Sequence, residues 1–73
     1  MESAIRQHDT LKCIEELNEL ATVLVQQHNK PHKDLTHKII EELGDVEYRI
    51  KQMYKYYDFT KVQQRIRDKW GEE

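Results

Sequence analysis

Apolar side chains recur every three or four residues along most of this chain, which is the spacing of one face of an α-helix. This spacing predicts a first helix over residues 10–28, preceded by a lead-in over residues 1–9. The expected apolar face of this helix comprises Cys13, Ile14, Leu17, Leu20, Ala21 and Leu24. We expect this face to pack against the next helix along the chain.

The clearest break in the pattern falls at Pro31, because proline disfavours helical geometry in the residue before it. A second helix is expected over residues 34–56, with Asp34 as its cap, and a third over residues 60–69, after an interruption that Asp58 or Thr60 can cap. The apolar stripe expected for the second helix comprises Leu35, Ile39, Leu43, Val46, Ile50, Met53 and Tyr57. No strand is expected. The predicted fold is all-α, an antiparallel helical hairpin plus a third short helix.

With 73 residues, the chain forms one small domain over residues 1–73. A domain of this size hides only about 60% of the surface that its unfolded chain exposes, so its core benefits from assembly. We therefore expect dimerisation or higher assembly.

The location of the protein is predicted from what the sequence lacks. No apolar run approaches the ~18 residues of a membrane span, and the N-terminus lacks the basic segment followed by an apolar one that marks a signal peptide. The single cysteine, Cys13, excludes an intrachain disulfide framework, and its place on an apolar face indicates a small buried hydrophobe. A cytoplasmic protein without a membrane partner is expected.

The net charge is only −2, but acids and bases are separated along the chain. Residues 41–47 contain four acids and no base, whereas residues 49–69 contain seven bases and two acids. This asymmetry suits a ligand of mixed charge, such as a polyphosphate that chelates a metal ion. Nucleic acid is not expected as a partner, because the basic segment is short and no recognised binding motif accompanies it.

An acidic pattern occurs twice, in residues 14–20 and again in residues 40–46. Within each copy the two acids lie about 60° apart on one flank of a helix, because each residue advances about 100°. The acids are Glu16 and Glu19 in the first copy and Glu42 and Asp45 in the second. Both pairs keep the same register to a leucine, Leu17 or Leu43. If the helices pack through those leucines, four carboxylates converge beside the apolar contact.

Two interpretations of the acidic pattern remain open. Lys12, Lys38 and Arg49 lie four residues from an acid, so each flank could be a ladder of surface ion pairs on a non-catalytic helical oligomerisation or interaction module. The other interpretation is a site for a hard cation. Mg²⁺ and Mn²⁺ take oxygen ligands, and carboxylates from facing helices are a known way to build a metal site in a bundle.

The spacing of the acids also resembles that of a known family. Glu15-Glu16-x-x-Glu19, followed after 22 residues by Glu42-x-x-Asp45, is similar to the signature of the MazG-like all-α nucleoside triphosphate pyrophosphohydrolases. The resemblance extends roughly from residue 11 to residue 67. It implies that a metal-activated water hydrolyses a (deoxy)nucleoside triphosphate to the monophosphate and pyrophosphate. Mg²⁺ is the implied cofactor, with Mn²⁺ as a substitute. The implied assembly is an oligomeric helical bundle, a homodimer or a homotetramer, with sites made from packed helices.

The same resemblance implies roles for the acids. Glu16, Glu19, Glu42 and Asp45 are the implied Mg²⁺ ligands. Glu15 lies about 100° from Glu16, so we expect it to support the catalytic site by orienting water or a ligand.

Three further residues are candidates for binding the nucleotide. Basic residues of the family's third helical segment contact the phosphates, and Lys61 and Arg65 occupy that segment here. A solvated basic face is the alternative reading of these two. Asn18 is expected either to contact the base or ribose or to be an ordinary polar surface residue. Because the chain is shorter than the usual family domain, part of the nucleotide pocket is expected to come from another subunit.

Overall fold

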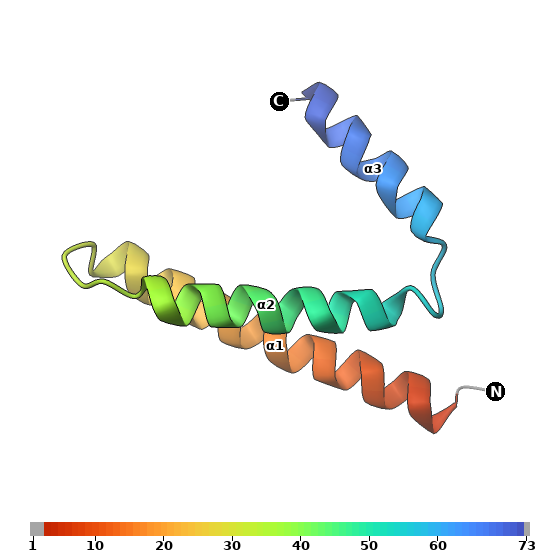
Figure 1. Cartoon of the computed structure of the whole chain (residues 1–73), viewed down its shortest axis with the longest axis horizontal. Helices are drawn as coiled ribbons and strands as arrows, with labels where there is room; N and C mark the ends of the chain where they lie inside the picture. The colour runs from red at the N-terminus through yellow and green to blue at the C-terminus, as the bar shows by residue number, and fades with distance from the viewer. Residues whose placement is uncertain (1–2, 73) are drawn as a thin grey trace.

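The computed structural model describes residues 3–72 and contains three α-helices joined by two short connections (Figure 1). They are α1 (Ala4–Asn29), α2 (Thr36–Met53) and α3 (Phe59–Glu72). No strand occurs between residues 3 and 72, so the predicted all-α class is confirmed. Over the same residues, no helix combines the length and the apolar character that crossing a bilayer requires.

The first helix starts earlier than its periodicity indicates, since most of the expected lead-in over residues 1–9 is helical from Ala4 onward. The side chain of Ser3 accepts a hydrogen bond of 3.0 Å from the backbone N–H of Arg6 and so satisfies one of the free amides of the first turn. Met1 and Glu2, the rest of the lead-in, lie outside the described residues.

Contacts with a distant segment also hold this first part of α1. The buried carboxylate of Asp9 accepts hydrogen bonds from the hydroxyl of Tyr56 at 2.6 Å and from the ammonium of Lys55 at 3.0 Å. These two bonds lower the pKa of Asp9 below its usual value. The guanidinium of Arg6 lies over the rings of Tyr56 and Tyr57. Periodicity cannot reveal these partners, because they lie about fifty residues further along the chain.

The connection between α1 and α2 is held by side chains at both of its ends. The amide of Gln27 donates hydrogen bonds to the carbonyls of Lys30 and Lys33, and its oxygen accepts one from the N–H of Leu35. Asp34, the expected cap, accepts hydrogen bonds from both the backbone N–H and the hydroxyl of Thr36, the first residue of α2. The chain therefore reverses direction, and α1 and α2 lie side by side (Figure 1).

We define the α1–α2 seam as the buried and half-buried residues through which the two helices face each other. On α1 their spacing alternates between four and three residues, and the spacings on the α2 side are also three or four. The seam comprises Asp9, Cys13, Glu16, Leu20, Val23 and Gln27 on α1, with Leu35 just before α2 and Ile39, Glu42, Val46, Ile50 and Met53 on it. Its apolar centre is formed by Cys13, Val23 and Val46, which are all buried.

The seam is rotated relative to the expected apolar faces. Leu17 and Leu43, through which we expected the helices to pack, remain 45% and 44% exposed, and Ile14 and Leu24 are also exposed. The apolar band of α1 is wider than one neighbouring helix can cover, and α2 covers only its edge at Cys13. Since successive residues advance about 100°, Leu17 and Leu24 lie on one side of the seam and Glu19 lies on the other.

The third helix extends away from the other two and packs against neither of them within the described chain (Figure 1). Asp58 accepts a hydrogen bond from the N–H of Thr60 at its start, and the ring of Phe59 packs on Tyr54 with the ring centroids 4.6 Å apart. Beyond this point its apolar side chains lack a covering element, and Trp70 is 76% exposed.

Candidate metal centre

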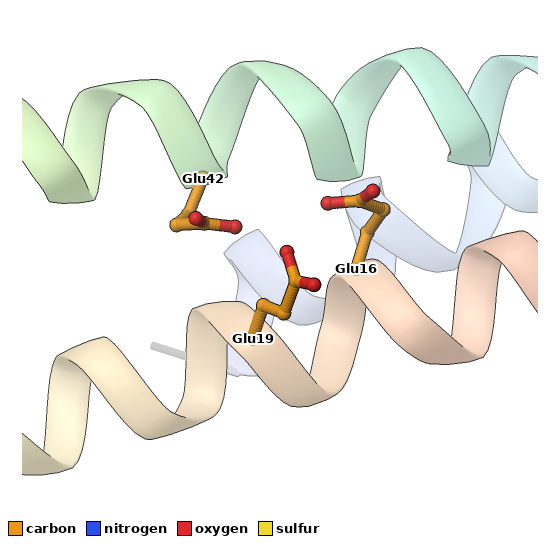
Figure 2. A group of neighbouring side chains, drawn as sticks. All are labelled: Glu16, Glu19 and Glu42. Atoms are coloured by element: carbon orange, nitrogen blue, oxygen red, sulfur yellow. The ribbon is translucent and has the colours of Figure 1, made fainter.

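Three carboxylates meet in the middle of the α1–α2 seam. Glu16 and Glu19 come from α1 and Glu42 comes from α2, and their side chains point toward one another (Figure 2). One oxygen from each of the three carboxylates can be selected so that all three oxygens lie within 4.8 Å of one another. We call these residues the acidic trio. Glu42 is only 3% exposed, Glu16 is half-buried and Glu19 is exposed.

Helical spacing explains why two of these acids are inside the seam. Glu16 lies one turn from Cys13 and one turn from Leu20, and all three residues belong to the seam of α1. Glu42 holds the matching place on α2, between Ile39 and Val46. The sequence placed the acids beside an apolar contact, whereas the structure places Glu16 and Glu42 within the contact itself.

The two seam acids carry oxygen atoms without a protein partner. The Oε2 atoms of Glu16 and Glu42 are both buried and accept no hydrogen bond within the described chain. A buried polar atom without a partner costs about 1–3 kcal/mol, and a charged group costs more. Such atoms are rare in folded proteins, and a bound water or ion commonly satisfies them. Carboxylate oxygens are the ligands that Mg²⁺ and Mn²⁺ prefer, so the donor atoms of the trio fit such an ion.

One base, Lys38, reaches the trio from the turn of α2 that precedes Glu42. The Nζ atom of Lys38 lies 3.1 Å from Oε1 of Glu42 and 3.9 Å from Oε1 of Glu41. The hydrogen bond to Glu42 and the negative charge of Glu41 raise the pKa of Lys38 above its usual value. Lys38 therefore remains charged and balances part of the negative charge of the trio.

The remaining charge acts on Glu19. Repulsion from the carboxylates of Glu16 and Glu42, followed by partial desolvation, raises the pKa of Glu19 above its ordinary value of 4.5. Protonation of Glu19 is thus easier in the folded protein than in the unfolded chain when no cation is bound. One ammonium does not offset three converging carboxylates.

We expect this repulsion to make the stability of the metal-free protein depend on pH. Because the folded state raises the pKa of Glu19, the contribution of this residue to the free energy of unfolding is fully present below about pH 4.5. It is lost as the pH rises through the pKa of Glu19 in the folded protein. The lowered pKa values of Asp9 and Asp34 give contributions that are already complete above about pH 4, and the raised pKa of Lys38 gives one that persists to alkaline pH. In chelator, the thermal midpoint should therefore fall between about pH 5 and pH 7, and Glu19→Gln should make this fall smaller. Thermal denaturation of both proteins across this range is the measurement, and equal slopes would contradict the repulsion.

Asp45, the fourth ligand expected from the sequence, lies in a second acidic group. Glu41, Glu42 and Asp45 also offer oxygens within 4.8 Å of one another, so the two groups share Glu42. Glu41 was not selected from the sequence, although its spacing of four residues from Asp45 places both on one face of α2. The structure thus brings three of the four expected ligands together and places Asp45 beside them with Glu41.

A groove of about 430 Å³ lies beside the trio on the side opposite Leu17. It is lined by Asn18, Glu19, Thr22, Val23, Gln26, Lys38 and Glu42. Asn18, Thr22 and Gln26 follow one another at four-residue spacing, so their polar side chains form a row that leads along α1 away from the trio. Only Asn18 of this row was selected from the sequence. The regular spacing of the other two was the available signal.

The remaining expected site residues lie outside this groove. Glu15 is exposed and pairs with Lys12 at 3.3 Å. Lys61 and Arg65 lie on α3, which does not pack against α1 or α2 in the described chain, and Arg65 pairs with Glu72 at 3.6 Å. Neither base lines the groove.

Comparison with known protein families, characterised proteins and solved structures finds no match. The functional argument therefore rests on the geometry and the chemistry of the trio and on the spacing of the acids in the sequence.

Proposed function

We propose that this protein is a Mg²⁺-dependent pyrophosphohydrolase that converts a (deoxy)nucleoside triphosphate to the monophosphate and pyrophosphate. The observation that carries the proposal is the meeting of Glu16, Glu19 and Glu42 in the seam, with buried, unpartnered oxygens on two of them. A helix pair that needed only stability would place apolar residues there, because removing several carboxylates from water together is costly. The resemblance of the acidic spacing to the MazG-like family supports the same activity.

The acidic trio would hold the ion, and Asp45 with Glu41 would extend the site through the shared Glu42. Bound Mg²⁺ would neutralise charge on the triphosphate chain and polarise a phosphoryl oxygen. Mn²⁺ prefers similar ligands and would substitute for it.

The groove beside the trio would hold the rest of the nucleotide. Asn18, Thr22 and Gln26 offer amide and hydroxyl groups that can donate or accept hydrogen bonds to a sugar or a base. In the reaction, the oxygen of a water molecule would form a bond to a phosphorus on one side of the α,β-bridge, and the bond from that phosphorus to the bridging oxygen would break. The monophosphate and pyrophosphate would separate, and the proton that the attacking water loses would pass to solvent or to a product oxygen. Lys61 and Arg65 would balance phosphate charge when α3 of the same or another subunit approaches, with Glu15 in support beside the trio.

The direct test is a panel of canonical and modified nucleoside triphosphates incubated with the protein and Mg²⁺. Pyrophosphate and the monophosphate should appear in equal amounts for at least one substrate, and chelator should stop the reaction. Release of orthophosphate alone would contradict the proposed position of cleavage. No turnover on any member of the panel would contradict the proposed activity.

The proposal includes assembly into a homodimer or homotetramer. Leu17, Leu24 and Leu43 are exposed on one side of the seam, and Ile66 and Trp70 are exposed on α3. A second copy that covers these side chains removes apolar area from water at about 25 cal/mol per Å². Sedimentation at micromolar concentration should give a mass well above 8.9 kDa, and a mass at that value would contradict the assembly.

A non-catalytic helical interaction module is the second candidate, and the exposed apolar residues of α3 favour it. The surface pairs Lys12–Glu15 and Lys38–Glu41 resemble the ion-pair ladder of such a module, although each spans three residues where four were expected. Of the expected pairs, Lys38–Glu42 is formed. However, the ladder does not account for the buried, unpartnered oxygens of Glu16 and Glu42. Mg²⁺ separates the two candidates, since it should bind and stabilise only the enzyme.

A further inference from the structure

Lys38 is the base whose ion pairs reach the acidic trio within the described chain, and it does so at the most buried carboxylate. Its Nζ atom lies 3.1 Å from Oε1 of Glu42, whose side chain is 4% exposed, whereas the side chain of Lys38 itself is 52% exposed. The pair thus joins a fixed, buried acid to a base that can turn toward solvent. Lys12, the base near the acids of α1, pairs instead with Glu15, which is outside the trio.

The two oxygens of Glu42 have different environments. Oε1 accepts the ion pair from Lys38, and Oε2 is buried and unpartnered. A divalent cation at the trio would take oxygens of Glu42 and would repel a nearby ammonium, because like charges at a few ångströms interact strongly where the environment is partly buried. Cation binding and the pair between Lys38 and Glu42 therefore compete for the same carboxylate.

A displaced Lys38 has a defined place to go. Its side chain lines the same groove as Asn18, Thr22 and Gln26, so the released ammonium remains beside the proposed nucleotide. The lysine ammonium is a compact charge on a flexible stem with three donors, which suits binding to phosphate oxygens. The ammonium can exchange one anionic partner for another without movement of the backbone.

We propose that Lys38 is the resident counter-ion of the acidic trio, and that a divalent cation displaces it from Glu42 into the groove, where it binds the phosphate chain of the substrate. This inference rests on the proposed function and adds the order in which the metal ion and the substrate bind. The cation binds first, and its binding creates a phosphate-binding ammonium. Binding of the metal and of the polyphosphate is then coupled through one side chain.

Mn²⁺ binding without nucleotide tests the first half. Lys38→Met keeps most of the stem but removes the charge, so the competing cation is lost and Mn²⁺ should bind about fivefold or more tightly, as measured by calorimetry or electron paramagnetic resonance. Lys38→Arg retains a competing charge and should not show this gain. Lys12→Met is the matched control, because Lys12 also pairs with a glutamate on a helix but not with one of the trio. Circular dichroism should show equal helicity in all four proteins.

The second half is tested with a nucleoside triphosphate whose α,β-bridging oxygen is replaced by NH, so that it is not cleaved. In saturating Mn²⁺ this analogue should bind Lys38→Met about fivefold or more weakly than the wild type, and without metal the two proteins should bind it equally. Equal affinities in Mn²⁺ would overturn the phosphate contact.

The outcomes separate this inference from the function on which it rests. If the wild type binds Mn²⁺ and Lys38→Met binds it equally or more weakly, the counter-ion role of Lys38 is wrong and the metal site stands. If the wild type binds no Mn²⁺ at millimolar concentration, the metal site and the role of Lys38 both fail.

Discussion

Replacing Glu42 by glutamine should lower the rate of pyrophosphate release at least about 100-fold. Loss of a residue that only supports a metal ligand typically costs about 10–100-fold, and Glu42 is proposed as a ligand itself, so its loss should cost at least the upper end of that range. Glu42 is the most buried acid of the trio and the residue that both acidic groups share. Glutamine keeps the length and shape of the side chain but removes its negative charge, so the proposed metal site loses its central ligand. The rate is measured with the best substrate of the triphosphate panel in Mg²⁺.

Helicity should be retained in the Glu42→Gln protein, because glutamine and glutamate have similar helix propensities. Glu47→Gln is the matched control, since Glu47 is an exposed acid of the same helix and belongs to neither acidic group. It should leave the rate unchanged. Full activity of the Glu42→Gln protein would show that the trio does not form the catalytic metal site.

Mg²⁺ should raise the thermal midpoint of the wild-type protein by about 10–20 °C when its concentration is about 100 times Kd. An ion that binds only the folded state then adds about 2.7 kcal/mol, and each kcal/mol shifts the midpoint by about 4–8 °C in a domain of this size. The unfolded chain does not compete well for the ion, because Glu42 is more than twenty residues away from Glu16 and Glu19 in sequence. Thermal denaturation followed by circular dichroism, with and without chelator, measures the shift.

Glu19→Gln should raise the thermal midpoint in chelator and reduce the rise that Mg²⁺ causes. In chelator the variant should melt at a higher temperature than the wild type near neutral pH, because repulsion from Glu16 and Glu42 is relieved. In Mg²⁺ it should lose most of the gain, because one ligand is missing. A wild-type protein whose midpoint does not respond to Mg²⁺ or Mn²⁺ would support the interaction module instead.

Local signals in the sequence predict the helices well and their ends less well. The break at Pro31 and the hydrogen bonds of Asp34 and Asp58 act over a few residues, so the start of α2 and the start of α3 lie close to where the pattern places them. The start of α1 is held by the Ser3 cap and also by the contacts of Asp9 with the segment after α2. A lead-in with one large apolar residue carries no sign of that contact.

The face through which α1 packs could not be predicted from periodicity. The apolar band of α1 includes both Cys13 and Leu17, and an isolated helix gives no reason to prefer one edge of the band over the other. In the structure α2 covers the edge at Cys13 and leaves Leu17 exposed. The choice depends on how the two helices fit together, which involves residues from both.

The sequence by itself determined that Glu16 and Glu19 share one flank of a helix and that Glu42 and Asp45 share another, because helical geometry sets the angle between residues three apart. Only the tertiary structure decided which of these acids meet across the seam. That outcome depends on the rotation of each helix about its axis and on their relative shift, which the short connection and the packing of the seam establish together. These two quantities place Glu42 against Glu16 and Glu19, leave Asp45 with Glu41, and bury the oxygens on which the proposed metal site depends.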